Sequence, residues 1–151
     1  MSSSLHDRLL TPTQLVQKYP AVELFCWTPS VVGALYNFGL MHGKRTEKAN
    51  IYESSFIELV GLANQVAANQ KVILNTTIYE FWTPQEIIEE YPELLRVWCW
   101  DASTIGTILS ARLLNGSKHK EHSAHILLPS FWTLVDYVNN MKDQQKLNLG
   151  K

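Results

Sequence analysis

The chain has 151 residues, of which 46% are hydrophobic, 11% aromatic and 18% charged, and its formal net charge is -1. This composition is typical of an ordered protein that buries a core, as one domain or as two small ones, and it excludes an intrinsically disordered chain. The near-neutral charge argues against indiscriminate binding of polyanions, although it allows a local basic patch.

The sequence also bears on the cellular location. Its first ten residues lack the apolar stretch of a secretory signal, and no apolar run approaches the ~20 residues that span a bilayer. Two cysteines, Cys26 and Cys99, are too few for a disulfide framework. Aromatic residues flank both, which is typical of small buried side chains. We therefore expect a cytoplasmic protein that does not associate with membranes.

The sequence contains one internal repeat, at an offset that grows from 72 to 75 residues. Fourteen of forty aligned residues are identical across three ungapped blocks, 11–20 with 83–92, 27–45 with 100–118 and 50–60 with 125–135. The register slips by one residue and then by two, where turns are plausible. We therefore predict a tandem duplication, with repeats at 9–74 and 81–149 related by a pseudo-twofold and a linker near 75–80.

Each repeat is expected to open with a short helix. Residues 11–14 (TPTQ) and 83–86 (TPQE) have the pattern of a capping box with proline at the first helical position. Pro20 and Pro92 should end these helices, because a proline in a helix interior loses a hydrogen bond and clashes with the preceding turn. A further short turn is predicted after each proline.

A second helix should begin at the cap residue Thr28 in the first repeat and at Asp101 in the second. Gly39 would end the first of these helices in the left-handed conformation. The second repeat has Arg112 at this position, so we expect that this cap is not shared. The expected inward-facing residues have helical spacing: Val31, Val32, Leu35 and Phe38, and in the second repeat Thr104, Ile105, Ile108 and Ala111.

Both second helices contain an interior glycine, Gly33 or Gly106, which costs about 1 kcal/mol relative to alanine. Its presence in both repeats is most simply explained by close contact with the preceding helix. Trp27 and Trp100, which align just before these helices, are expected in the core because large aromatic side chains dominate burial.

The rest of each repeat is expected to be a glycine-containing basic loop, a short strand, a third helix and a last strand. The loop contains Gly43 or Gly116, and the third helix starts near Ser54 or Pro129. The segments 71–74 (KVIL) and 146–149 (KLNL) are the candidates for the last strand.

This order of elements, with the segments VVGALYNFGLMHGKR, IGTILSARLLNGSK and IYESSFIELV, resembles the winged helix-turn-helix DNA-binding units of the MerR and excisionase families. The resemblance implies a mainly helical fold with short β wings, in which the second helix is the recognition helix. The tryptophan-bearing segment before that helix and the "KYP" and "EYP" segments depart from the usual pattern of those families.

The second helices are predicted to approach base edges in the major groove, because their outer faces are small and mostly polar and asparagine suits adenine. The candidate residues on these faces are Ser30, Ala34, Asn37, Ser103, Thr107 and Ser110. No aspartate or glutamate occurs at 28–45 or 102–118, which favours the same interpretation. The candidate phosphate contacts are the basic residues of the wings: Lys44, Arg45, Lys48, Arg112, Lys118 and Lys120.

Other interpretations of these residues remain open. The basic loops are also compatible with solvated turns, and the small outer faces with packing between the repeats. His119, His122 and His125 lack the spacing and the further ligands of a zinc site, so no metal or other cofactor is expected. No phosphate-binding glycine-rich loop, nucleophile elbow or paired carboxylates occur, and neither cysteine has a recurring base, so an enzyme is not expected.

Two functions follow as hypotheses. The first is a double-stranded DNA-binding protein, acting in transcription regulation or as an accessory factor in recombination. A protein partner or a second copy of the chain could join it. The second is a protein–protein interaction module on a helix-turn-helix-like fold without DNA binding, which the low net charge and the many aromatic residues favour.

Overall fold

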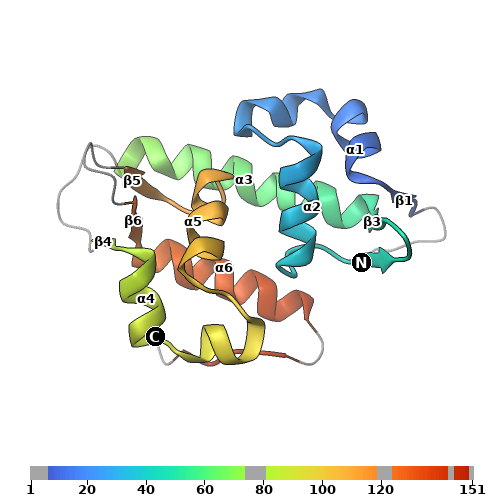
Figure 1. Ribbon diagram of the computed structural model, residues 1–151. Coiled ribbons are helices and arrows are strands. Elements are labelled where there is room, and N and C mark those ends of the chain that lie inside the picture. The colour runs from blue at the N-terminus through green and yellow to red at the C-terminus, as the bar shows by residue number, and fades with distance from the viewer. Residues whose placement is uncertain (1–6, 74–80, 119–123, 143–144, 150–151) are drawn as a thin grey trace. The chain divides into compact units, whose positions relative to one another are not determined.

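The computed structural model describes residues 7–73, 81–118, 124–142 and 145–149 (Figure 1). The chain divides into two compact units, Met1–Leu62 and Ala63–Lys151, which are called the N-terminal and the C-terminal unit below. Both are built mainly from helices with a small antiparallel sheet. The repeat limits at 9–74 and 81–149 stay a prediction about the sequence.

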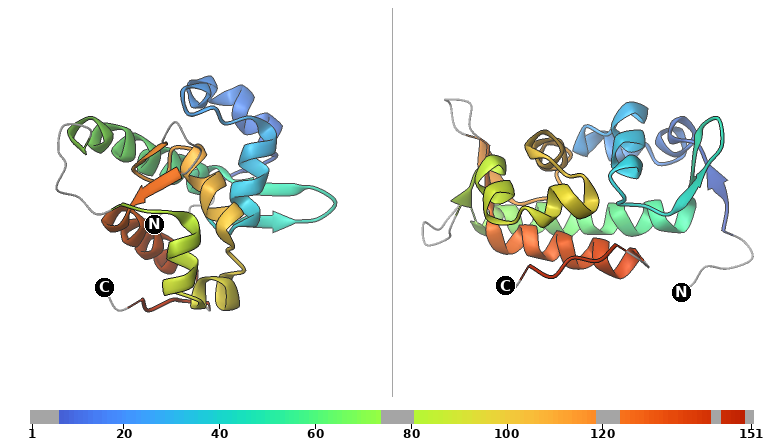
Figure 2. Two further views of the ribbon diagram at one scale, coloured as in Figure 1. Left: turned by 60° about the vertical axis from the view of Figure 1, so that its left-hand side comes forward. Right: turned by 60° about the horizontal axis from the view of Figure 1, so that its bottom comes forward.

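The N-terminal unit has a three-stranded sheet of order β1-β3-β2. Three helices lie in the chain between its first strand and the other two. Its elements are β1 (Leu9–Leu10), α1 (Pro12–Lys18), the 3-10 helix η1 (Pro20–Phe25), α2 (Pro29–Asn37), β2 (Gly43–Arg45), β3 (Ala49–Tyr52) and the first part of α3 (Glu53–Ile73). The hairpin of β2 and β3 extends away from the helices of this unit (Figure 2). The largest fully buried side chains of the unit are Leu15, Trp27, Leu35, Leu40, Ile51, Phe56 and Leu59.

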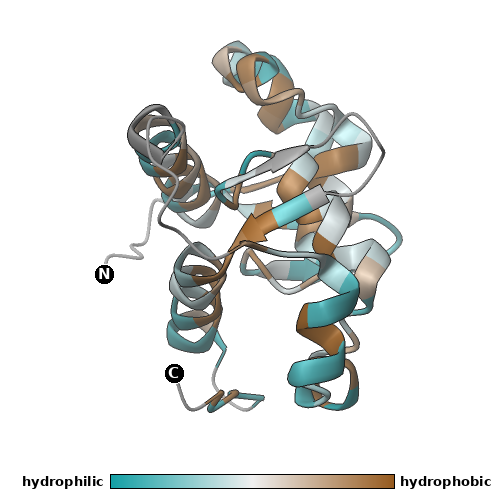
Figure 3. Ribbon diagram, turned by 90° about the vertical axis from the view of Figure 1, so that its left-hand side faces the viewer, coloured by the Kyte–Doolittle hydropathy of each residue, from teal (hydrophilic) through white to brown (hydrophobic). Residues whose placement is uncertain are grey.

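The C-terminal unit begins within α3 and has a sheet of order β4-β6-β5. Its further elements are β4 (Phe81–Trp82), α4 (Pro84–Glu90), the π-helical segment η2 (Leu94–Trp98), α5 (Ala102–Ser110), β5 (Gly116–Lys118), β6 (Ala124–Leu127) and α6 (Leu128–Met141). Trp100 and Phe131 lie in its core, edge to face with ring centres 6.5 Å apart. The helices carry hydrophilic and hydrophobic residues along their length, as amphipathic helices on a core do (Figure 3).

The two sheets pair in equivalent register. Gly43 opposes Ile51 in the N-terminal unit, and Gly116 opposes Ile126 in the C-terminal unit. Both glycines are required sterically: a Cβ atom would lie 2.1 Å from the Asn50 oxygen at Gly43 and 2.2 Å from the His125 oxygen at Gly116. Each hairpin therefore begins where two backbones approach too closely for any side chain.

The two slips in the sequence register fall at identifiable places. In η1 the Trp27 amide donates to the Val22 carbonyl at 3.2 Å, five residues back, whereas in η2 the Trp100 amide donates to the Leu94 carbonyl at 3.1 Å, six residues back. The extra residue thus widens a 3-10 turn into a π turn. The slip of two lies between the hairpin strands, which are joined by residues 46–48 in one unit and 119–123 in the other.

The predicted helix starts are confirmed. Thr11 and Thr83 each cap a helix by accepting a hydrogen bond from the backbone of the third helical residue, whose side chain returns to the cap backbone. Thr28 and Asp101 cap α2 and α5. Trp27 is buried like Trp100, as expected. Within the described residues, no helix is both long and apolar enough to cross a membrane.

The left-handed positions correct two expectations. Gly39 has φ 89°, as predicted, but Arg112 at the equivalent position also has a positive φ of 68°, so the backbone conformation is shared although the glycine is not. Cys26 and Cys99 are exposed, contrary to the prediction that they are buried. They end η1 and η2 in the left-handed conformation, at φ 63° and 62°.

The remaining expectations for the elements are partly wrong. Residues 71–73 continue α3 instead of forming a strand, residue 74 lies outside the described part, and 146–149 form no strand. The strands β1 and β4 were not expected. A Cβ atom at Gly33 would make only an ordinary 3.9 Å contact with Pro12, and one at Gly106 would meet nothing within 4 Å. The predicted close helix contact is therefore wrong.

Candidate nucleic-acid interface

The outer face of α2 is exposed and free of acidic residues. The Thr28 hydroxyl accepts from the Val31 amide at 3.2 Å and fixes the start of this nine-residue helix. Ser30 and Asn37 are exposed, and the half-buried Ala34 lies between them, about one helical turn from each. Val32 and Leu35 are fully buried on the opposite side, whereas the expected inward residues Val31 and Phe38 are only half-buried.

The hairpin β2–β3 presents its cations on different faces. Arg45 side-chain atoms contact α2, and because side chains alternate along a strand, Lys44 belongs to the other face of the hairpin. Lys48 lies in the connecting loop, where its carbonyl accepts from the Thr46 amide and from Asn50 Nδ2, both at 3.1 Å. The loop is thus closed by its own hydrogen bonds, and the side chains of Lys44, Arg45 and Lys48 are exposed.

Arg45 joins the hairpin to the end of α2. Its Nη2 atom donates to Asn37 Oδ1, and its Cζ atom lies 5.7 Å from the centre of the Tyr36 ring, within the range of a cation–π contact. Two predicted site residues, Asn37 and Arg45, are therefore in direct contact. The sequence pattern gave no indication of this hydrogen bond, or of the part played by Tyr36.

The C-terminal unit has mostly different side chains at the positions equivalent to this site. Ser103 and Ser110 are exposed on α5, and Thr107 is half-buried with its hydroxyl donating to the Ser103 carbonyl at 3.0 Å. Arg112 is exposed just after the helix. Lys118 pairs with Ala124 in the register that Arg45 and Ala49 occupy in the other unit. Lys120 lies outside the described residues.

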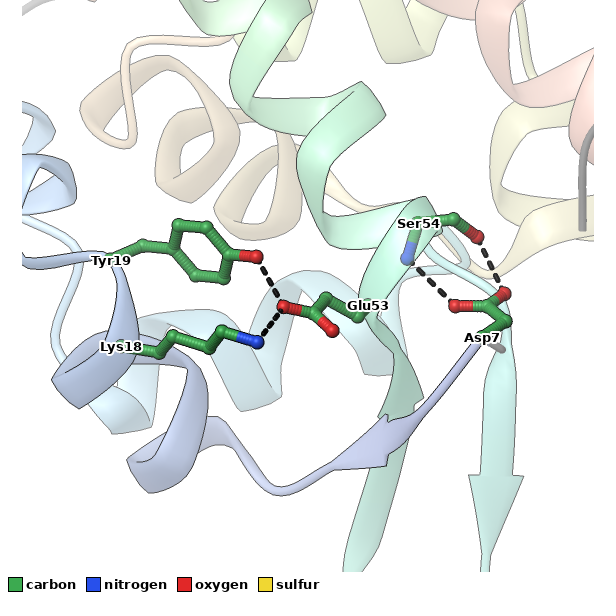
Figure 4. Close-up of polar contacts among 5 residues, drawn as sticks. All are labelled: Asp7, Lys18, Tyr19, Glu53 and Ser54. Atoms are coloured by element: carbon green, nitrogen blue, oxygen red, sulfur yellow. Dashed lines mark hydrogen bonds and ion pairs between the residues drawn. The ribbon is translucent and has the colours of Figure 1, made fainter. Parts of the chain in front are cut away.

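Glu53, the acidic residue at the start of α3, is held by neighbours within the N-terminal unit (Figure 4). Lys18 Nζ lies 2.6 Å from Glu53 Oε2, and the Tyr19 hydroxyl donates to the same oxygen. These hydrogen bonds lower the pKa of Glu53, and the Glu53 carboxylate raises the pKa of Tyr19 to about 12. The negative charge of Glu53 is therefore balanced by Lys18 within this cluster.

Asp7 is a second acidic residue whose carboxylate is bound within the N-terminal unit. Its carboxylate accepts from the Ser54 amide at 3.0 Å and from the Ser54 hydroxyl at 2.6 Å, at the first turn of α3 (Figure 4). By contrast, none of Lys44, Arg45 and Lys48 forms an ion pair with another described residue. The hairpin cations thus remain available to an external anion.

The histidine hypothesis falls mostly on residues that the structure does not describe. His119 and His122 lie outside the described part, and His125 lies in β6 opposite Ser117. In the described ranges, no three metal-binding side chains come together.

The comparisons with known proteins found no relative of this chain. No family model, no curated protein and no solved structure matches the chain. The resemblance to MerR and excisionase units therefore stays an expectation drawn from the sequence.

Proposed function

We propose that the protein binds double-stranded DNA and that each unit is a winged helix-turn-helix-like unit. The observation that carries this proposal is the exposed, acid-free outer face of α2, joined by the Arg45–Asn37 hydrogen bond to a hairpin of unpaired cations. Small polar side chains let a helix enter the major groove, and flanking cations bind phosphates.

In this proposal α2 and α5 are the two recognition helices. Ser30, Ala34 and Asn37 face the bases in the N-terminal unit, and Ser103, Thr107 and Ser110 do so in the C-terminal unit. Proteins of this kind place two helices in successive major grooves about 34 Å apart, usually by dimerising. Two units in one chain would supply the pair for a transcriptional regulator or a recombination accessory factor.

The alternative is a protein–protein interaction module. Exposed large hydrophobic side chains favour it: Leu24 is 77% exposed, Leu95 50% and Ile57 49%. The net charge of -1 also agrees better with a protein partner than with a polyanion.

A mobility-shift titration with random duplex DNA separates the two functions. We expect binding at about 50 mM salt with micromolar protein, and steep weakening as salt rises, because phosphate contacts release counterions. The double variant Lys44→Glu, Lys118→Glu should lose binding. Lys146→Glu, which reverses an exposed charge that belongs to neither hairpin, serves as the matched control and should lose much less. Absence of any shift at low salt would favour the interaction module.

A further inference from the structure

We infer that the Asn37–Arg45 pair makes the N-terminal unit select guanine rather than adenine. This inference rests on the proposed function and concerns the base at the end of α2. It departs from the simple expectation that a recognition-helix asparagine reads adenine.

The geometry of the pair determines which atoms remain for a base. A guanidinium has five N–H donors and no acceptor, so the Asn37 carboxamide must turn its oxygen toward Arg45 and its nitrogen away. The Arg45 Cζ atom lies 5.7 Å from the centre of the Tyr36 ring, and this cation–π contact helps to hold the guanidinium beside Asn37. Asn37 Nδ2 and the remaining N–H groups of Arg45 are then the groups left to meet a ligand.

Such a donor-only pair matches one base better than the others. Guanine presents two neighbouring acceptors, N7 and O6, in the major groove, whereas adenine presents the acceptor N7 beside the donor N6. An unconstrained asparagine reads adenine because its oxygen accepts from N6 while its nitrogen donates to N7. The Asn37 oxygen keeps a second lone pair, but the cationic guanidinium of Arg45 lies against it, so adenine would bring its N6 donor next to the N–H donors of Arg45.

The C-terminal unit does not carry this pair. Ser110 ends α5 as Asn37 ends α2, and Leu109 stands where Tyr36 stands. Guanine selection is therefore placed in the N-terminal unit alone, and the C-terminal unit adds affinity with little discrimination at the equivalent base.

Selection of a randomised duplex pool on the full-length protein tests this inference. We expect a guanine to be enriched at one position, and replacing it with 7-deazaguanine, which removes the N7 acceptor, should weaken binding about tenfold. Arg45→Ala should free the Asn37 oxygen and move the preference at that position to adenine. Lys48→Ala is the control, because loss of a phosphate contact weakens binding to all sequences alike.

The outcomes separate the inference from the function on which it rests. If duplex DNA binds with no guanine preference, or if Arg45→Ala leaves the preference unchanged, the pair does not select a base, although DNA binding stands. If no duplex binds at any salt concentration tested, both the function and the inference fail. The 7-deazaguanine measurement uses the unmodified protein, so a folding defect in a variant cannot imitate its result.

Discussion

Three residues other than glycine adopt the left-handed backbone conformation in the described part of the chain, and two of them are the cysteines. Cys26 and Cys99 end η1 and η2, and Arg112 ends the turn after α5. Each costs on the order of 1 kcal/mol relative to the right-handed region. Since the backbone conformation recurs at equivalent positions, the turn geometry is set by the fold and tolerates side chains that do not favour it.

Two glycines of the C-terminal unit should respond in opposite directions to substitution by alanine. Gly106→Ala should stabilise the unit by up to about 1 kcal/mol, because the Cβ atom meets nothing within 4 Å and alanine favours a helix. Gly116→Ala should cost about 2 kcal/mol, because its Cβ atom would lie 2.2 Å from a backbone oxygen. Urea unfolding followed by tryptophan fluorescence measures both. Equal effects would contradict the described approach of β5 to β6.

Tyr19 should give the protein a stability change at alkaline pH. Tyrosine in an unfolded chain titrates near pH 10, whereas the Glu53 carboxylate raises the pKa of Tyr19 to about 12. The folded state therefore holds this proton more tightly, so the stabilisation is complete below about pH 10 and is lost as pH rises toward 12. Tyr19→Phe should unfold with a flatter pH dependence in this range.

The measurement for Tyr19 is the free energy of unfolding at several pH values between about 9 and 12. Tyr52→Phe is the control, because it removes a tyrosine hydroxyl without touching Glu53. At the acidic side, the lowered pKa of Glu53 means that its contribution is present above its ordinary pKa and is lost as pH falls through the shifted one. A wild-type curve that coincides with that of Tyr19→Phe would show that the hydrogen bond adds nothing.

At the scale of elements, the side chain of Asn115 links β5 to α3 inside the C-terminal unit. Asn115 is 4% exposed, and its Nδ2 atom donates to the Val66 carbonyl at 2.8 Å and to Gln70 Oε1 at 3.1 Å. The Gln70 carboxamide in turn binds both backbone groups of Gly116, accepting from its amide at 3.2 Å and donating to its carbonyl at 2.8 Å. Gln70 thus pairs with the edge of β5 as a neighbouring strand would.

Asn115→Ala should therefore destabilise the C-terminal unit by about 2 kcal/mol, because buried hydrogen-bonding groups lose their partner. His42→Ala is the matched control, since His42 holds the equivalent position with an exposed side chain. The backbone hydrogen bonds are the same at both positions: the His42 and Asn115 amides donate to Ser55 and Ser130, each at 2.8 Å. Chemical denaturation compares the two, and a similar loss in both would contradict the described role of the Asn115 side chain.

The sequence predicts the elements whose causes lie within a few residues. The capping boxes at Thr11 and Thr83 are local, and so are their helices. The strand β1 is two residues long and pairs with β3 some forty residues away, so no local pattern marks it. The end of α3 was mistaken for a strand because Val72 and Ile73 are β-branched residues, which favour strands when nothing packs beside them.

The candidate site is likewise predictable from the sequence only where its causes are local. The outer faces of α2 and α5 follow from helical periodicity, and the exposure of Ser30 and Asn37 agrees with it. The contact of Asn37 with Arg45 depends on the direction in which the hairpin leaves the helix. The chain between these two residues passes through a left-handed turn at Gly39, whose direction local propensities do not give.

For the whole molecule, a net charge of -1 has to be reconciled with binding to a polyanion. The acidic residues lie mainly outside the α2 and hairpin segment, and Glu53 is paired with Lys18. The cations of the hairpin are exposed. An uneven distribution of charge can therefore support association with DNA, and its strength should depend on salt far more than on net charge.

The number of phosphate contacts should be readable from the salt dependence. Each contact adds about 0.9 to the slope of log K against log salt concentration. Lys44→Ala should reduce that slope by about one and the double variant Lys44→Ala, Lys48→Ala by about two, because these side chains are exposed and unpaired among the described residues. Lys146→Ala is the control and should leave the slope unchanged. Fluorescence anisotropy with a labelled duplex between about 50 and 200 mM salt measures it. An unchanged slope in the double variant, or an equal fall in the control, would place the phosphate contacts elsewhere than on the hairpin.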